Sequence, residues 1–167
     1  MTLPHTTPPP GFEAASSVPN QDAMWTLFRG DRFAASIGAE LTGWGAGWSR
    51  LTWTPREEHV NFAGSTHGGA LFTVGDAAFA VGCNAWGRAS VALSVDVHFL
   101  KAVKVGTGLV ATCTERTRSR RTGSYGIEVV TADDPTRVVA SLHAMAFRTE
   151  IWHLGEDAWP DAWRSLA

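Results

Sequence analysis

The stretch GGALFTVGDAAFAVGCNAW, residues 68–86, decides the fold of this chain. Its small and apolar side chains would surround a helix on nearly every side, instead of forming a single stripe. A helix of this kind is stable where it is buried, so we expect residues 68–86 to form a helix inside the molecule. Asp76 is the only charged residue between His67 and Arg88.

The residues that follow show the alternation typical of β-strands. Apolar side chains occupy every second position in four segments, 91–99, 109–113, 125–129 and 138–142. Turn signals rich in glycine, threonine and aspartate separate these segments. A buried helix followed by consecutive strands predicts an α+β fold, in which an antiparallel sheet wraps around a central helix.

Earlier in the chain, residues 37–54 are expected to form strands, with a turn at residues 45–47. Asn20 is positioned to cap a helix that ends near Gly30.

Proline content marks the N-terminal boundary of the domain. Five of the eight prolines lie in the first 20 residues, so we interpret residues 1–19 as a flexible leader. Residues 20–150 would form one domain, and residues 151–167 a tryptophan-rich tail that folds back over it.

The composition of the 167 residues excludes several classes of protein. The chain is 44% hydrophobic and 18% charged, with a formal charge of -2, which gives no electrostatic reason to expect a nucleic-acid partner. Its two cysteines have no neighbours at metal-ligand spacing, so neither a disulfide framework nor a zinc site is expected. Without a long apolar run or a signal segment, the chain is predicted to be cytoplasmic and not to enter a membrane.

Asp76 is the first candidate for chemistry. A buried carboxylate without a partner costs several kcal/mol, so a purely structural helix would tend to avoid one. The alternative is that Asp76 faces solvent or bonds a neighbouring backbone group.

The segment NFAGSTHGG, residues 61–69, lies immediately before this helix. Backbone N–H groups at a helix start lack partners, and glycines allow a ligand oxygen to approach them closely. The segment is therefore a candidate oxyanion site. The alternative is a tight turn whose glycines only guide the chain, with His67 as its cap.

These residues resemble the PaaI-like (phenylacetate-degradation type) acyl-CoA thioesterases of the hot-dog superfamily. Their pattern places an asparagine six residues before His-Gly-Gly and an acid nine residues after that histidine, as Asn61, His67 and Asp76 do here. The resemblance covers about residues 20–148. It implies a hot-dog fold, a strongly curved antiparallel sheet around the helix, assembled as a homodimer or homotetramer. It also implies an acyl-CoA substrate and no metal or cofactor.

By this resemblance, Asp76 would be the general base or nucleophile that attacks the thioester carbon. The Gly68 N–H would bind the thioester oxygen, with Gly69 nearby. His67 and Asn61 would orient the thioester and the attacking water.

The chain departs from the family at two positions. Ala80 replaces a hydroxyl residue that the family often has one turn after the acid, so a group that could hold the water is missing. Ala102 replaces a common proline.

Helix geometry indicates that one chain cannot complete this site. Asp76 lies eight residues beyond Gly68, about 12 Å along the axis at about 1.5 Å per residue. A reacting carbon must lie about 3 Å from both groups. We therefore expect Asp76 of one subunit to meet Gly68 of another across a two-fold axis.

Basic residues could bind the phosphates of coenzyme A. Arg120 and Arg121, supported by Lys101, have the charge and donor geometry for this role. A solvated hairpin is the alternative interpretation.

Further polar residues on the strands are given no catalytic role. Ser94, Asp96 and His98 share one face of a strand, which indicates an exposed face or a subunit contact. His143 is interpreted as an ordinary sheet residue.

The preferred function is hydrolysis of a small or medium acyl-CoA, aromatic ones included, to the free acid and coenzyme A. Hydration or dehydration of a hydroxyacyl thioester is one alternative, although the loop of the related dehydratases is absent. The other is a non-catalytic module that binds or senses acyl-CoA, which Asp76 argues against and Ala80 favours.

Overall fold

The structure is a computed structural model that describes residues 7–167. Its helices are α1 (Gln21–Arg29), α2 (Arg32–Ser36), α3 (Gly68–Asn84) and α4 (Asp161–Leu166), with short 3-10 helices at Ala15–Ser17, Glu57–His59 and Glu156–Ala158. Its strands are β1 (Glu40–Gly45), β2 (Trp48–Trp53), β3 (Arg88–Phe99), β4 (Leu109–Arg118), β5 (Thr122–Thr131) and β6 (Val138–Trp152).

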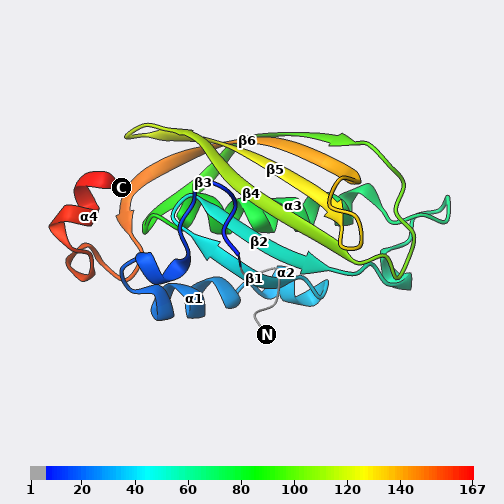
Figure 1. Ribbon diagram of the computed structural model, residues 1–167, viewed down its shortest axis with the longest axis horizontal. Helices are drawn as coiled ribbons and strands as arrows, with labels where there is room; N and C mark the ends of the chain where they lie inside the picture. Colours follow the sequence, from blue (N-terminus) through cyan, green and yellow to red (C-terminus); the bar gives the residue numbers. More distant parts are fainter. Residues whose placement is uncertain (1–6) are drawn as a thin grey trace.

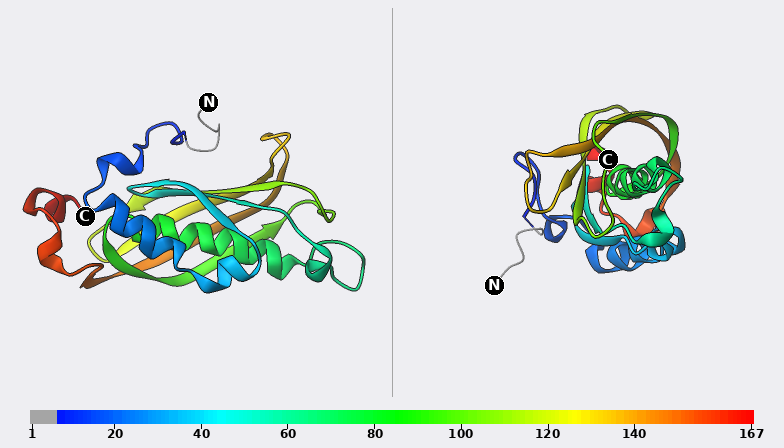
Figure 2. Two further views of the ribbon diagram at one scale, coloured as in Figure 1. Left: turned by 90° about the horizontal axis from the view of Figure 1, so that it is seen from below. Right: turned by 90° about the vertical axis from the view of Figure 1, so that its right-hand side faces the viewer.

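The helix α3 lies within the curve of the sheet, as the end-on view in Figure 2 shows. Leu71, Ala77 and Phe79 point in different directions around its axis, and all three are buried. This confirms the prediction of a buried helix, although the helix ends at Asn84, before the predicted residue 86.

All strand pairs in the sheet are antiparallel, in the order β1-β2-β4-β5-β6-β3 (Figure 1). The strands β4, β5 and β6 follow one another as hairpins, whereas β3 pairs with β6 and lies at the edge. The predicted α+β fold, an antiparallel sheet wrapped around a central helix, is confirmed. So is the predicted turn at residues 45–47, which joins β1 to β2.

Small residues let the sheet approach α3 closely. A Cβ atom on Gly75 would lie 2.9 Å from the side chain of Leu142 on β6. On Gly82 it would lie 2.7 Å from Cys113 Sγ on β4. These contacts leave no room for a larger residue, which explains why the helix is rich in glycine and alanine.

One stripe of α3 remains accessible. Thr73, Asp76 and Asn84 are half-buried and Ala80 is exposed, and their spacing of three or four residues places them along one face. The only charged residue of the helix therefore lies on the face that the sheet does not cover.

Segments outside the sheet pack against its end. Trp48 Nε1 donates to the carbonyl oxygen of Glu13 at 2.6 Å, and Val18 is buried. Glu13 and Val18 belong to the leader expected at residues 1–19, of which residues 1–6 lie outside the described residues. Asn20 precedes α1 as expected, but its side chain makes no capping bond and instead donates to Ala158 of the tail.

The tryptophan-rich tail packs against α1, because Trp159 and Met24 belong to one buried apolar cluster. The C-terminus and α4 lie together at one end of the molecule in Figure 1. Trp159 is buried, and Trp163 Nε1 donates to the carbonyl oxygen of Trp86 just after α3.

The edge strand β3 exposes apolar side chains. Val91 is 56% exposed and Leu93 is 57% exposed, and Phe99 and Leu100 at the other end are also exposed. An unpaired edge with apolar side chains is a typical surface for association with another chain.

Candidate active site

Asp76 occupies the middle of the accessible stripe of α3. Burial raises the pKa of its carboxyl group, and the carboxylate of Asp31 raises this pKa further. Asp31 is held at the start of α2, where its side chain accepts hydrogen bonds from the N–H groups of Phe33 and Ala34, each at 2.9 Å. A half-buried carboxylate with a raised pKa is typical of a group that accepts a proton during catalysis.

The start of α3 presents one free backbone donor. His67 is the N-cap, and its Nδ1 accepts a hydrogen bond from the Gly69 N–H at 2.8 Å. The Gly68 N–H, in contrast, has no acceptor within residues 7–167. Of the two glycines that the sequence offered as oxyanion donors, Gly68 is therefore the available one.

The hydrogen bond of His67 also orients its ring. Because Nδ1 accepts from Gly69, the ring proton lies on Nε2. The capping role that the sequence left open is thus present, and Nε2–H remains to donate to a ligand.

A pocket of about 300 Å³ opens at Gly68. Asn61, Phe99 and Lys101 also line it, and a Cβ atom on Gly68 would lie 3.2 Å from the Phe99 ring. The pocket therefore brings together a backbone donor, an aromatic ring and a lysine side chain.

Asn61 organises the loop beside this pocket. Its Oδ1 accepts hydrogen bonds from the N–H groups of Ala63 and Ser65, and its Nδ2 donates to Ser65 Oγ at 3.1 Å. One amide hydrogen of Asn61 is left for a ligand or a water molecule.

Asp76 does not line this pocket. It lies eight residues beyond Gly68 on the same continuous helix, about 12 Å along the axis. One chain therefore contains both halves of the expected site but holds them apart.

Comparisons with known proteins identify the family of this chain. Residues 63–138 match the model of the Thioesterase superfamily, and this span includes His67, Gly68 and Asp76. The chain is 34% identical over 110 residues to the acyl-coenzyme A thioesterase PaaI of Escherichia coli (strain K12), covering 66% of this chain and 79% of that protein. The chain belongs to the PaaI-like acyl-CoA thioesterases.

Solved structures of PaaI proteins share the fold. The structure of E. coli PaaI, from the phenylacetic acid degradation operon, has a TM-score of 0.72 at 30% identity, covering 77% of this chain and 94% of that one. A variant of the phenylacetic acid degradation protein PaaI from Thermus thermophilus has a TM-score of 0.67 at 30% identity, covering 71% and 100%. These likenesses confirm the hot-dog fold.

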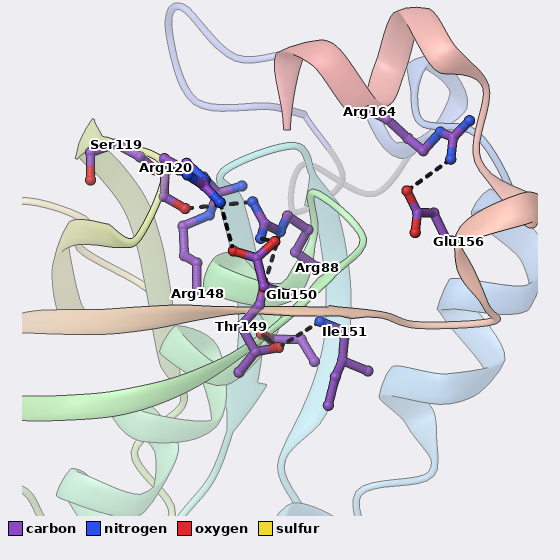
Figure 3. Close-up of polar contacts among 10 residues, drawn as sticks. Arg88, Ser119, Arg120, Arg148, Thr149, Glu150, Ile151, Glu156 and Arg164 are labelled. Carbon is purple, nitrogen blue, oxygen red and sulfur yellow. Dashed lines mark hydrogen bonds and ion pairs between the residues drawn. The ribbon is translucent and has the colours of Figure 1, made fainter.

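In this member of the PaaI-like family, Arg120 lies within a cluster of charged residues at the β4–β5 hairpin (Figure 3). Glu150 accepts from Arg88 at 3.0 Å and from Arg120 at 3.3 Å, and Arg148 donates to the carbonyl oxygen of Ser119 at 2.6 Å. Arg120 itself remains exposed, as does Arg121. Both side chains could therefore reach a phosphate.

Lys101 lies at the opposite end of the sheet from this hairpin. Its N–H donates to Val139, whereas Arg121 accepts from the N–H of Arg148. Val139 and Arg148 are nine residues apart on β6, which corresponds to about 30 Å. Within one chain, Lys101 therefore groups with Gly68 and not with the arginines.

The residues to which the sequence gave no catalytic role lie on exposed surfaces. Ser94, Asp96 and His98 are exposed on β3, where Asp96 Oδ2 and His98 Nε2 are 4.0 Å apart, and His143 is exposed on β6. Among residues 7–167, no group of histidine, cysteine and acidic side chains could hold a metal ion, and no helix is long and apolar enough to cross a membrane.

Sequence reasoning missed Asp31. Its position before a short helix is a recognisable capping signal, but only the fold shows that its charge acts on Asp76.

Proposed function

We propose that the protein hydrolyses a small or medium acyl-CoA, aromatic ones included, to the free acid and coenzyme A. The observation that carries the proposal is that α3 presents two groups suited to this reaction. Asp76 is a half-buried carboxylate with a raised pKa, and the Gly68 N–H is a backbone donor without an acceptor within residues 7–167. The E. coli relative is named as an acyl-CoA thioesterase, and its operon as one for degradation of phenylacetic acid.

In the proposed reaction, the thioester oxygen binds the Gly68 N–H, which stabilises the negative charge that develops on it. As a general base, Asp76 takes a proton from water while the water oxygen forms a bond to the thioester carbon. The carbon–sulfur bond then breaks, and the sulfur leaves with a proton as the thiol of coenzyme A. As a nucleophile, Asp76 would instead attack the thioester carbon, and the carbon–sulfur bond would break to leave an anhydride and the thiolate of coenzyme A. Water would then cleave the anhydride to the free acid and the Asp76 carboxylate, and its proton would convert the thiolate to the thiol.

His67 and Asn61 act as orienting groups in this proposal. His67 Nε2–H and the remaining amide hydrogen of Asn61 can each donate to the thioester or to the attacking water. The Gly69 N–H donates to His67 Nδ1, which leaves the Gly68 N–H as the donor for the thioester oxygen.

Two subunits complete the site in this proposal, as a homodimer or a pair of dimers. The separation of about 12 Å between Gly68 and Asp76 requires that each group meets its counterpart across a two-fold axis. The exposed apolar side chains of β3, such as Val91 and Leu93, supply the surface for association.

Antiparallel pairing of two β3 edges would also bring the Lys101 end of one subunit to the hairpin end of the other. Lys101, Arg120 and Arg121 could then contact the phosphates of a single coenzyme A. In that arrangement their separation within one chain is no obstacle.

We also propose a cytoplasmic location. Cys83 and Cys113 are free and buried, as is usual where thiols stay reduced.

A non-catalytic module that binds acyl-CoA is the second candidate, which Ala80 favours because no hydroxyl follows Asp76 by one turn. Release of free thiol from a panel of acyl-CoAs separates the two functions. Hydrolysis by the wild type that is lost in Asp76→Asn supports the thioesterase. Binding of acyl-CoA without any thiol release would support the module.

A further inference from the structure

Asp31 lies beside the part of α3 that carries Asp76, although it precedes a different helix, α2. It lines one cavity of about 360 Å³ together with Ala77, the residue after Asp76. It also lines one of about 500 Å³ together with Ala80, which follows Asp76 by one helical turn on the same face. Ala34 of α2 packs with Ala77 in the buried core, which fixes α2 against α3. The carboxylate of Asp31 is therefore held close to the space beside Asp76.

One oxygen of the Asp31 carboxylate caps α2 and the other remains available. Oδ1 accepts both capping bonds, from the N–H groups of Phe33 and Ala34. Oδ2 has no hydrogen-bond or ion-pair partner within residues 7–167. Because the two bonds to Oδ1 hold the carboxylate in one orientation, Oδ2 is an acceptor whose position is set before a ligand arrives.

The side chains that follow Asp76 on the accessible stripe of α3 supply no such acceptor. Ala80 carries only a methyl group. The Asn84 amide bonds the backbone N–H of Ser90 and the carbonyl oxygens of Ala80 and Ser90, and its Oδ1 lies 2.7 Å from His153 Nε2. A water molecule that bonds Asp76 on this side can instead find its second acceptor at Asp31 Oδ2.

The charge of Asp31 also acts on Asp76. Burial raises the pKa of Asp76 and the Asp31 carboxylate raises it further, and a carboxylate with a higher pKa is a stronger base. Among residues 7–167, the other ionisable side chains around this face of α3 are Arg29 of α1, Glu40 of β1, Cys83 of α3 and His153 of the tail. Of all these groups, Asp31 is the one whose charge shifts the pKa of Asp76.

We propose that Asp31 is a positioning residue for the hydrolysis, and that its Oδ2 atom holds the attacking water beside Asp76. The water donates one hydrogen to Asp31 and the other to Asp76, which directs a lone pair of its oxygen toward the thioester carbon. Asp76 then takes one proton as the water oxygen bonds the carbon, and this proton leaves with the sulfur as the thiol of coenzyme A. The inference rests on the proposed thioesterase function and assigns the water-holding role to a side chain outside α3.

The test uses Asp31→Asn, because asparagine caps a helix as well as aspartate does and the substitution removes only the charge and the available acceptor. Thiol release from the best acyl-CoA of the panel is measured across pH, beside thermal unfolding. We expect kcat to fall by about tenfold, as for loss of one hydrogen bond to a charged group, with KM within about twofold of the wild type. The acidic limb of kcat/KM should move to lower pH, because loss of the neighbouring charge lowers the pKa of Asp76.

Two further variants show whether the effect is local. Asp22→Asn, the same substitution at an exposed position in the first turn of α1, is the matched control and should keep the wild-type kcat and pH profile. Ala80→Ser, added to Asp31→Asn, should restore part of kcat, because its hydroxyl supplies an acceptor one turn after Asp76. Its effect should be larger in this background than in the wild type, which is not expected of independent positions.

The outcomes separate this inference from the proposed function. A kcat of Asp31→Asn within about twofold of the wild type, or an acidic limb that does not move, would overturn the inference and leave the thioesterase function standing. So would an Ala80→Ser substitution with the same effect in both backgrounds. No hydrolysis of any acyl-CoA by the wild type would overturn both. If Asp31→Asn does not fold, Asp31→Ser is measured in the same way, because serine keeps one capping oxygen.

Discussion

Replacing Gly68 by alanine adds one methyl group at the start of α3, and its effects on activity and on stability should diverge. The new Cβ atom would lie 3.2 Å from the nearest atom of the Phe99 ring and 3.4 and 3.5 Å from two others. The ring must therefore move by a few tenths of an ångström, which its exposed position allows. The methyl group and the displaced ring would then occupy the space where a thioester oxygen approaches the Gly68 N–H.

The expected magnitudes follow from this geometry. Loss of one oxyanion donor costs about 100- to 1,000-fold in rate, and here the donor remains but is crowded, so kcat/KM should fall by about 10- to 100-fold. Stability should change little, because alanine favours the helix by up to about 1 kcal/mol and the close contact offsets part of that gain. The melting temperature should therefore stay within about 4 °C of the wild type.

The assay is thiol release from acyl-CoA, measured beside thermal unfolding. Gly108→Ala is the matched control, because its Cβ atom would meet only Ala132, at 3.3 Å, and should leave kcat/KM unchanged. Full activity of Gly68→Ala at normal stability would refute the assignment of Gly68 as the oxyanion donor.

Asp76→Asn should lower kcat by about 100- to 10,000-fold with the fold and assembly intact, and near-normal turnover would reject the mechanism. Burial raises the pKa of Asp76, so the charged carboxylate opposes folding, and the stability that the protonated carboxyl group contributes is lost as pH rises. Asparagine carries no charge, so at pH 7 the Asp76→Asn variant should be at least as stable to urea as the wild type. Removal of both Arg120 and Arg121 should raise KM for acyl-CoA more than it lowers kcat, by less at high salt; unchanged kinetics would return the hairpin to a solvated turn. Ala80→Ser should raise kcat or leave it unchanged, and a large drop at an unchanged melting temperature would show instead that Ala80 makes room for the substrate.

The core of the fold could be predicted because its signals are local. The apolar circumference of residues 68–84 predicted a buried helix, and strict alternation predicted the strands around it. The spacing of Asn61, His67 and Asp76 is equally local, so the sequence alone sufficed to select these residues.

Contacts between distant segments could not be predicted. The side chain of Asn20 bonds Ala158 instead of capping its own helix, since the capping signal says nothing of the tail. Lys101 and Arg120 lie at opposite ends of the sheet, because β4 runs between them along its length. His153 meets Asn84 only because the tail returns to the end of α3.

The most direct test of the central claim, that Asp76 of one subunit acts with Gly68 of another, is a subunit-mixing experiment. Asp76→Asn and Gly68→Ala chains, each of low activity, are unfolded together in equal amounts and refolded, and thiol release is measured. A mixed dimer would contain one site with both native groups, and half of the dimers would be mixed, so about a quarter of the wild-type activity should return. If both groups act within one chain, the mixture will show no more activity than the average of the two variants, and the shared site will be contradicted.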